Sequence, residues 1–458
     1  METEKKSSMQ ETQSSIRKRR KPFFQLNEKQ LGYAMVIPSL LLVIIVTLWP
    51  VTQSFWNSMF DYRLNDPARS QKMLESTIDL ERYTDNFFYI GSQLDSLESA
   101  AKSEQAKKTV ADIEAGVEGY HSELISDASI KEKVDQIDQL LMNYKPVTND
   151  ELKYNKVEDS FAEEYRASLT TYQKELAGLA ASTNDEALAE QYQQTSDLLG
   201  ATSETILKSN FIGFANYAKY FQDQRMWQSL WNTTLFTAVS VAFELVLGLA
   251  IALLINRSFN GRGLVRASVL IPWAIPTAVA AMMWGFLYDG QSGIVAHYLE
   301  VFQLIPDASW LLSTSDGGMF SVIFADVWKT TPYMALLLLA GLQTIPSSLY
   351  EASNVDGANR FQQFLKITLP LLKSSILVAL LFRTLDAFRV FDLIYVLTGG
   401  GPANATESIS IYAYKTLFAQ QNFGEGSVLS VIVFLCVAII SFIYVKLIGS
   451  ELFAGRTK

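Results

Sequence analysis

The chain has 458 residues, 49% of them hydrophobic, and a mean hydropathy of +0.12 although it also contains a long polar stretch. Its apolar residues must therefore be concentrated in separate segments. The single cysteine, Cys436, excludes an intrachain disulfide, and two histidines far apart in the sequence, His121 and His297, argue against a metal site. The net charge of −9 averages unlike parts of the chain and indicates no class of partner.

Windows of about twenty apolar residues, long enough to cross roughly 30 Å of hydrocarbon, occur six times. In chain order they are 33–53, 233–255, 267–287, 319–342, 374–397 and 428–447. The first window is too long for the apolar part of a signal peptide and lacks a small-x-small cleavage site near its end. The sequence predicts a polytopic membrane protein whose first helix is retained.

Basic residues near the predicted helix ends indicate the side of the membrane on which each loop lies. A basic run at 17–21 precedes the first helix, and Lys or Arg also occurs in the connectors 256–266 and 347–373 and in the tail. The other two short connectors contain only Lys415. We therefore expect six membrane helices with both termini in the cytoplasm.

About 175 residues separate the first two predicted membrane helices, and most of them have the spacing of amphipathic helices. Three apolar stripes step by three and four: Val110, Ile113, Val117, Tyr120 and Leu124; Ile130, Val134, Ile137, Leu141 and Tyr144; Phe161, Tyr165, Leu169, Tyr172, Leu176 and Leu179. Breaks at 126–129, 145–150 and 182–185 favour an antiparallel bundle. The stripes are typical of a buried core, with a ligand groove as the alternative. The insert either contacts a partner outside the cell or only stiffens the first helix.

The aromatic segment 210–221, which precedes the second membrane helix, predicts a helix lying along the outer membrane surface.

A polar segment, SSLYEASNVDGANRFQQFLKITLP (347–370), lies between the fourth and fifth predicted membrane helices, although a connector needs only a few residues. Ser348 and Glu351 have the spacing of a capping box, and Gly357 predicts a break after this first short helix. A second helix follows, and Pro370 ends it or opens the next membrane helix. The pattern predicts a helix–turn–helix elbow, with an amphipathic linker on lipid headgroups as the alternative.

Ionisable residues inside predicted membrane helices are costly, and such residues usually face a cavity or a partner. The fourth helix contains Asp326 and Lys329. The fifth contains Arg383, Asp386, Arg389 and Asp392, of which Arg383 and Asp386 share a face, as do Asp386 and Arg389. These residues form either structural ion pairs or a polar site for a transported solute.

The stretch EASNVDGANRFQQFLKITLP (351–370) resembles the cytoplasmic signature of ABC importer permeases: Glu-Ala-Ala, a glycine, then Ile-x-Leu-Pro. The matching residues are Glu351, Ala352, Asp356, Gly357, Ala358, Phe364, Ile367, Leu369 and Pro370, with Ser353 in place of the usual second alanine. The stretches 213–217, 232–257, 270–293 and FRVFDLIYVLTGGGPANATESISIYAYKTLF (388–418) are similar to sugar-importing permeases, the group containing the maltose and glycerol-phosphate systems.

The resemblance implies an all-α, polytopic fold with six transmembrane helices and a large extracytoplasmic helical insert between the first two. The implied parts are a cytoplasmic tail (1–30), a first membrane helix (31–56), the insert (57–209), a five-helix permease core (210–449) containing a coupling elbow (347–370), and a cytoplasmic tail (450–458). The resemblance also implies a multi-pass protein of a bacterial or archaeal plasma membrane.

The implied function is transport of a carbohydrate, a di- or oligosaccharide such as a maltodextrin, without enzyme activity in this chain. The sequence has no G-x-x-x-x-G-K-[ST] motif, so ATP and Mg belong to a separate ATPase. The implied partners are a second permease forming a heterodimer, an ATPase dimer, an extracytoplasmic solute-binding protein and membrane lipids, but no nucleic acid, and the chain itself needs no metal or cofactor. The implied ATPase-coupling residues are Glu351, Ala352, Ser353, Asp356, Gly357 and Ala358. The implied substrate-binding residues are Asp326, Lys329, Thr330, Tyr333, Arg383, Asp386, Ala387 and Val390.

Two other classes of membrane protein are the alternatives. A sensor with an extracytoplasmic helical domain predicts a large cytoplasmic domain after the second membrane helix, where the loop has only about ten residues. A secondary transporter predicts inverted repeats, which the sequence does not display, and leaves the elbow without a role.

Overall fold

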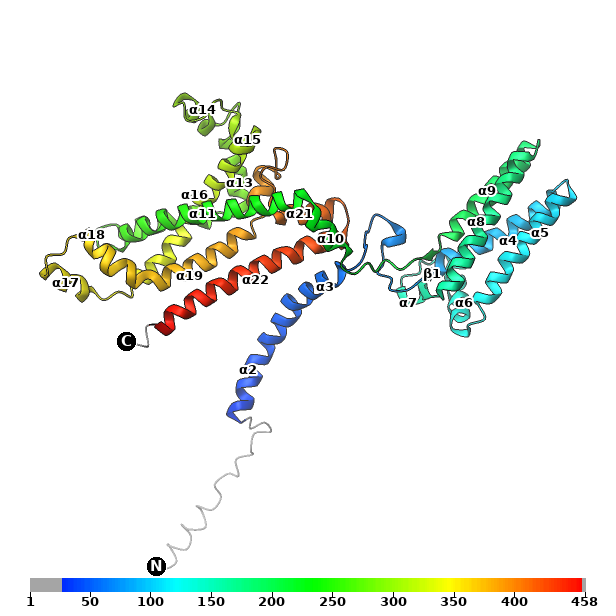
Figure 1. Ribbon diagram of the computed structural model, residues 1–458, viewed down its shortest axis with the longest axis horizontal. Coiled ribbons are helices and arrows are strands. Elements are labelled where there is room, and N and C mark those ends of the chain that lie inside the picture. The colour runs from blue at the N-terminus through cyan, green and yellow to red at the C-terminus, as the bar shows by residue number, and fades with distance from the viewer. Residues whose placement is uncertain (1–26, 455–458) are drawn as a thin grey trace, which may run out of the picture. The chain divides into compact units, whose positions relative to one another are not determined.

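The computed structural model describes residues 27–454, which are mostly helical (Figure 1). The basic run at 17–21, most of the predicted tail 1–30, and Arg456 and Lys458 lie outside the described residues. The chain divides into two compact units, with the division between Gln53 and Ser54.

Residues Leu31–Asn57 form one apolar helix of 27 residues, long enough to cross a membrane. Its segments are α2 (Glu28–Val43), the π-helical turn η1 (Ile44–Leu48) and α3 (Trp49–Asn57). The π-helical turn comes just before Pro50, whose ring has no N–H to donate to the preceding turn.

The described residues contain five helices long and apolar enough to cross a membrane, or six if one bent pair forms a single span. After the first helix these are α11 (Gln224–Asn256); the bent pair α12 (Arg262–Ala274) and α13 (Thr277–Leu287); α16 (Ser315–Leu342); a continuous helix made of α18 (Arg360–Gln363), η3 (Phe364–Thr368) and α19 (Leu369–Phe388); and α22 (Phe423–Ala454). The predicted count of six therefore depends on how the bent pair is counted.

Two predicted membrane helices differ from the structure. The window 267–287 is bent by 88° between α12 and α13 because Pro276 has no N–H and disfavours a helical residue before it. The window 374–397 is interrupted after Phe388, and a separate helix, α20 (Asp392–Leu397), follows. Helix α20 packs on α13 and buries Leu393 and Ile394, so the sequence stays apolar on both sides of the break. The break after Phe388 therefore cannot be recognised from hydropathy.

The permease core is organised around α11, which packs along α16, while α19 contacts both. Gly248 allows the closest approach, because a Cβ at this position would lie 2.8 Å from Cγ of Met334. Shorter helices complete this region: α10 (Ala215–Gln222), α14 (Ile294–Val301), α15 (Trp310–Ser313), α17 (Ser347–Val355), α21 (Ile409–Tyr414) and η4 (Lys415–Ala419). Of the aromatic segment 210–221, residues 215–221 lie in α10; its position at the membrane surface stays a prediction.

The insert is a helical bundle whose long helices are α4 (Leu80–Ala100), α5 (Glu104–Leu124), α6 (Ala128–Met142), α8 (Asp159–Ser182) and α9 (Glu186–Ser203). The three predicted stripes fall on α5, α6 and α8, and residues such as Ile113, Ile137 and Leu169 are buried in one apolar core. The exception is Tyr144, which lies beyond the end of α6, where the chain turns with a positive φ, and is 98% exposed. Side chains of Ser103, Asp127 and other residues cap the helices by accepting a backbone N–H. The bundle therefore has the interior of an ordinary soluble domain.

A small sheet, absent from the all-α prediction, lies within the insert. Its strands β1 (Thr77–Asp79), β2 (Tyr154–Lys156) and β3 (Ile206–Leu207) are antiparallel in the order β2-β1-β3, with Ile78 opposite Asn155 and Ile206. Strands of two or three residues are too short to give an alternating pattern in the sequence. The remaining short elements are α7 (Asp150–Lys153) and the 3-10 turn η2 (Pro67–Arg69).

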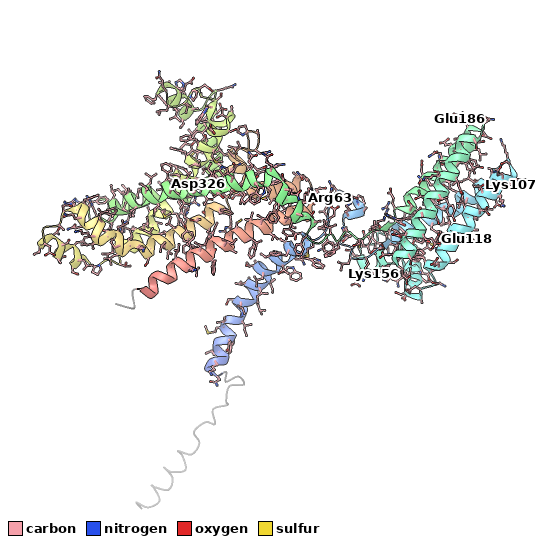
Figure 2. The ribbon with its side chains drawn as sticks, in the orientation of Figure 1. Arg63, Lys107, Glu118, Lys156, Glu186 and Asp326 are labelled. Atoms are coloured by element: carbon pink, nitrogen blue, oxygen red, sulfur yellow. The ribbon has the colours of Figure 1, made fainter. Side chains whose placement is uncertain are left out.

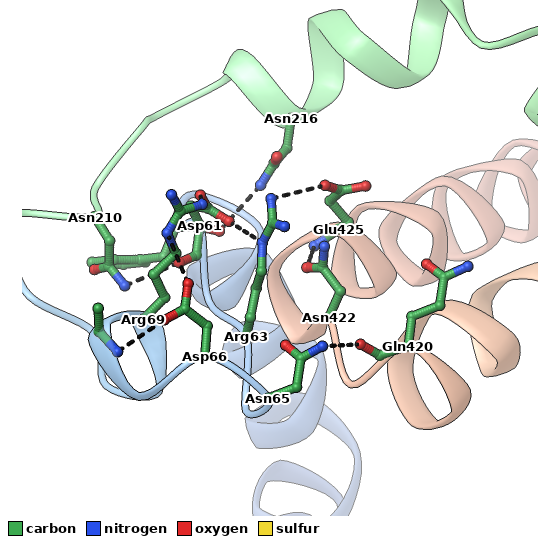
Figure 3. Close-up of polar contacts among 12 residues, drawn as sticks. Asp61, Arg63, Asn65, Asp66, Arg69, Asn210, Asn216, Gln420, Asn422 and Glu425 are labelled. Carbon is green, nitrogen blue, oxygen red and sulfur yellow. Dashed lines mark hydrogen bonds and ion pairs between the residues drawn. The ribbon is translucent and has the colours of Figure 1, made fainter.

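We use the name stem for the two segments that lead into and out of the insert, 58–76 and 208–216. Figure 3 shows their polar contacts with the turn before α22. Arg63 Nε lies 2.7 Å from Asp61 and its Nη2 lies 3.7 Å from Glu425, while Asn65 Nδ2 donates to the carbonyl of Gln420 at 3.3 Å. The stem is thus held by side chains and not by backbone alone.

Asn210 lies at the centre of the stem and is buried. Its Oδ1 accepts the backbone N–H of Met73 at 2.8 Å, and its Nδ2 donates to the carbonyls of Gln71 at 2.7 Å and Asp61 at 3.1 Å. Asn216 donates in the same way to the carbonyls of Ser58 and Phe60, each at 3.1 Å. Two asparagines therefore satisfy backbone groups of an irregular segment.

The elbow has the predicted two arms but different end signals. The predicted capping box at Ser348 and Glu351 is wrong, because Pro346 is the N-cap of α17 and no side chain caps that helix. A capping box instead joins Asn359 and Gln362 at the start of the second arm. Gly357, with φ +78°, lies at the predicted break.

Pro370 neither ends a helix nor begins one. The π-helical turn η3 precedes it, and Leu369 N–H donates to the carbonyl of Phe364, five residues earlier. This wider turn lets the helix pass a residue that lacks an N–H. The second arm of the elbow therefore continues into α19 as one rigid helix.

Candidate functional site

Arg383 on α19 joins three membrane helices through a buried ion cluster. Its side chain is 2% exposed and its guanidinium contacts Glu244 on α11, with Nη2 at 2.9 Å from Oε1 and Nε bonded to Oε2. Nη2 also contacts Asp326 on α16, which is labelled in Figure 2, and Nη1 lies 3.1 Å from Asp386. We call Glu244, Asp326, Arg383 and Asp386 the ion cluster.

The ion cluster is well supplied with hydrogen bonds. Thr330 Oγ1 lies 2.6 Å from Glu244 Oε1, so the glutamate accepts from both a hydroxyl and a guanidinium. Within a low-dielectric interior, a charged group of this kind is tolerated only when it is paired and hydrogen-bonded. Removing Arg383 therefore leaves the carboxylates of Glu244 and Asp326 buried without a cation, whereas the Asp386 side chain is 63% exposed.

A cavity of about 420 Å³ lies beside the ion cluster and is called here the permease cavity. Its lining residues are Trp273, Thr277, Asp326, Lys329, Thr330, Arg383, Asp386, Ala387, Arg389, Val390, Phe391, Asp392 and Leu393. Seven of the eight predicted substrate residues are among them. The exception, Tyr333, stacks on Trp273 with 5.5 Å between ring centroids and supports that wall from behind.

The charges around the permease cavity are balanced but not all paired. Three acids, Asp326, Asp386 and Asp392, face three bases, Lys329, Arg383 and Arg389. Lys329 is 7% exposed, and among residues 27–454 its ammonium makes no hydrogen bond and no ion pair within 4 Å. Arg383 acts as a structural cation, as the ion-pair interpretation expects, whereas Lys329 remains available to a ligand.

Glu244 is the member of the ion cluster that the sequence interpretation does not include. It is fully buried and lies in the apolar run of α11. The rule that identified Asp326 and Arg383, an ionisable residue within a membrane helix, applies to it equally. The same signal is therefore present in the second predicted membrane helix, 233–255.

The elbow presents its predicted coupling residues at the surface of the described chain. Glu351, Ala352, Asp356 and Gly357 are exposed, and Ser353 and Ala358 are half-buried. Gln363 Nε2 donates to Ser353 Oγ at 3.0 Å, and the hydroxyls of Tyr350 and Thr368 lie 2.9 Å apart. These contacts join the two arms and leave the outer face of α17 open, with Val355 89% exposed.

A second buried carboxylate lies in the loop before α21. Glu407 is fully buried, and its oxygens lie 2.8 and 2.9 Å from the guanidinium of Arg225 and 2.8 Å from Lys415 Nζ. Burial alone raises the pKa of this carboxyl, but the hydrogen bonds and charges of Arg225 and Lys415 outweigh burial and lower the pKa below its ordinary value.

The family described as binding-protein-dependent transport system inner membrane components matches residues 244–452. The trehalose/maltose transport system permease protein MalF of Thermococcus litoralis is 47% identical over 236 residues, which are 52% of this chain and 79% of that protein. This chain belongs to that permease family.

Two further relatives agree with this membership. The trehalose transport system permease protein SugA of Mycobacterium tuberculosis is 48% identical over 246 residues, 54% of this chain and 78% of that protein. The sulfoquinovosyl glycerol transport system permease protein SmoG of Agrobacterium fabrum is 39% identical over 245 residues, 54% of this chain and 79% of that protein. A crystal structure of a bacterial ABC transporter involved in alginate import is 23% identical, with a TM-score of 0.48 over 52% of this chain and 84% of that chain.

Membership of the permease family confirms the predicted ABC importer permease and its largely helical, multi-pass membrane fold. The ion cluster, the permease cavity and the elbow all lie within the matched range 244–452. The insert precedes that range, so its role is a separate question from that of the permease core.

Proposed function

We propose that this permease carries a di- or oligosaccharide through the permease cavity. The observation that supports this most is the balanced lining: three acids and three bases around a space with an aromatic wall. Equal numbers of opposite charges favour a neutral, hydroxyl-rich solute over an anion or a cation. The relatives named for trehalose and maltose support the same class of solute.

The lining supplies both parts of sugar recognition. Asp386 and Asp392 can accept from hydroxyl groups, and the unpaired ammonium of Lys329 can donate to them. Trp273, 45% exposed and supported by Tyr333, offers a flat apolar surface for the face of a sugar ring. Arg383 acts indirectly, because its ion pairs fix the spacing of the three helices that carry these groups.

The chain depends on other subunits for energy and delivery. In this proposal a separate ATPase dimer binds ATP and Mg, and the exposed face of α17 inserts into a groove on it, as helices do in many complexes. A second, different permease completes the membrane pathway, and an extracytoplasmic solute-binding protein delivers the sugar. Both termini and the elbow lie in the cytoplasm, and the insert lies outside.

Alternating access follows from the rigid second arm. Because residues 360–388 form one continuous helix, a displacement of the elbow by the ATPase moves Arg383 and the rest of the ion cluster with it. When the ATPase dimer closes on ATP, the movement of the elbow therefore opens the permease cavity to the outside, where it accepts the sugar. When the dimer opens again, the cavity faces the cytoplasm and releases the sugar.

The substrate proposal is tested by uptake of a labelled maltodextrin in proteoliposomes containing all subunits. Replacing Asp386 by Asn, or Lys329 by Met, should raise KM about tenfold, since a hydrogen bond to a charged group contributes about 1.5–3 kcal/mol. The matched control is Asp316→Asn, an exposed acid in the first turn of α16 that does not line the cavity. Unchanged KM in both cavity variants contradicts the proposed site.

The coupling proposal is tested at Gly357, where a Cβ meets no atom within 4 Å but φ is +78°. Gly357→Val should uncouple ATP hydrolysis from uptake, because a β-branched residue strongly disfavours this backbone conformation, whereas Asn tolerates it. We expect the Val variant to insert into the membrane and its complex to hydrolyse ATP with little uptake, and Gly357→Asn to transport normally. Normal uptake by the Val variant is incompatible with the elbow acting as a lever.

A further inference from the structure

A second cavity, of about 400 Å³, lies in the insert between α4, α5 and α6, and it has no part in the function proposed above. We call it the insert cavity. Its wall includes Phe87 and Thr84 on α4, Glu114 and His121 on α5, and Asp138 on α6. It therefore combines aromatic, hydroxyl and acidic groups from three helices.

The aromatic side of the insert cavity is fixed in place. The rings of Phe87 and His121 are stacked, with centroids 4.0 Å apart and an interplanar angle of 12°. The Tyr83 hydroxyl lies 2.9 Å from His121 Nδ1 and so holds the imidazole in its plane. Burial lowers the pKa of His121, although the charge of Glu118 opposes this, and so disfavours the charged form of the imidazole.

The polar side of the insert cavity is acidic. Glu114, Glu118, Asp135 and Asp138 line it, no Lys or Arg does, and among residues 27–454 none of these four carboxylates has an ion-pair partner within 4 Å. Glu118 lies on α5 (Figure 2). Burial and the neighbouring acids, including Asp95, raise the pKa of Glu114, which shows how closely like charges are gathered.

Thr84 is a second feature of the insert cavity, because it carries a buried hydroxyl that lacks a hydrogen-bond partner among the described residues. Its side chain is 8% exposed, it lines the cavity, and its hydroxyl has no hydrogen-bond partner among the described residues. Buried hydroxyls are nearly always satisfied, since an unmet one costs about 1–3 kcal/mol. A ligand group in the cavity can remove this cost.

We propose that the insert cavity binds a small organic cation, an ammonium group carried on an apolar or aromatic stem. The carboxylates neutralise the ammonium, the stacked rings of Phe87 and His121 receive the cation and its stem, and the Thr84 hydroxyl accepts an N–H. This lining differs from the permease cavity, where acids and bases are equal in number. The inference therefore stands apart from the saccharide proposal and concerns a different ligand class.

The test uses 4-fluorobenzylammonium as the probe and ligand-observed fluorine NMR on the full-length chain in detergent. We expect saturable binding that weakens at higher ionic strength. Glu114→Gln should weaken binding about threefold to tenfold, as should Phe87→Leu, which keeps most of the volume but loses the aromatic ring. Asp112→Asn, an exposed acid on the same helix α5 that does not line the cavity, should leave binding unchanged.

Thr84→Val separates a ligand-binding role from a structural one. Removing an unsatisfied hydroxyl should leave the melting temperature unchanged or higher, yet weaken binding of the probe about threefold. Neutral 4-fluorobenzyl alcohol measures binding to detergent and to any purely apolar pocket.

Several outcomes overturn the proposal: equal binding of the alcohol and the ammonium, competition by maltose, equal effects of Asp112→Asn and Glu114→Gln, or no saturable binding. None of these outcomes bears on sugar uptake through the permease cavity.

Discussion

The permease core and the insert use opposite patterns of the same residue types. The core buries charges such as Arg383 and Glu244 and turns large apolar side chains such as Val246 and Phe442 outward. The insert buries an apolar core and, apart from the buried Asp79 at the start of α4, places most of its carboxylates at the surface or around the insert cavity. The side-chain pattern of the core suits a lipid environment, and that of the insert suits water. Replacing a charged side chain should therefore lower the stability of the core strongly and that of the insert, at most positions, very little.

The largest expected effect comes from breaking the ion cluster. Replacing Arg383 by Met leaves Glu244 and Asp326 buried without a cation, and the loss of one partner of a buried pair costs about 3–5 kcal/mol. We expect a lower melting temperature in detergent and no sugar uptake. Arg257→Met is the control, since this exposed arginine lies outside the permease cavity, and its side chain makes no hydrogen bond and no ion pair within 4 Å among the described residues. Equal melting temperatures of the two variants contradict the structural role of Arg383.

The corresponding change in the insert is an apolar truncation. Leu169 on α8 is 1% exposed, so Leu169→Ala should destabilise the bundle by about 2–4 kcal/mol. Hydrogen exchange should quicken in α5 and α8 and remain slow in α11 and α16. Thr171→Ala, at an exposed position of the same helix, serves as the control. Faster exchange in α16 as well means that the two regions unfold together.

The stem connects the two regions, and Asn210 is its most heavily bonded side chain. Asn210→Ala removes three hydrogen bonds to backbone groups, with a local cost of about 2 kcal/mol. Limited proteolysis should then cut within 61–73 faster than in the parent protein. Asn65→Ala, which removes one long bond from an exposed side chain, should change the cleavage rate little.

The smallest expected effect is a pH dependence at Glu407. Its pKa in the folded protein is below the ordinary 4.5, so its contribution to stability is complete above that pH and is lost as the pH falls through the lowered value. The parent protein should melt higher than Glu407→Gln at neutral pH, by about 1 kcal/mol in unfolding free energy, and the difference should shrink below about pH 4.5. Glu300→Gln, at an exposed position, should match the parent at every pH. If the difference in stability between the parent protein and Glu407→Gln grows as the pH falls, the prediction is wrong.

The sequence predicts those parts of the fold in which an apolar run or a periodic spacing of apolar residues extends over many positions. Four of the six predicted membrane helices and the stripes of α5, α6 and α8, apart from Tyr144, extend over many residues, and their positions agree with the structure. The bend at Pro276 and the interruption after Phe388 were missed because mean hydropathy records composition and not backbone breaks. The strands around Ile78 are too short to give any period.

The candidate site shows the same division. Charged residues such as Asp326 and Arg383 stand out against an apolar background, so the cavity lining was largely predictable. Their pairing with Glu244 was not, because it depends on how α11 packs along α16 and α19. The sequence prediction placed the capping box at Ser348, but the structure has it at Asn359. Ser348 cannot be an N-cap, because its helix already begins at Ser347, directly after Pro346.

The segment that enters the insert and the segment that leaves it lie next to each other. Phe60 pairs with Phe211 in an isolated antiparallel bridge, and Asp61 N–H donates to the carbonyl of Asn210 at 2.8 Å. A domain whose two ends are adjacent can be inserted, removed or exchanged during evolution without changing the spacing of the flanking helices. A permease shortened by joining residue 60 to residue 211 through a brief glycine linker therefore has the geometry to keep its membrane portion intact.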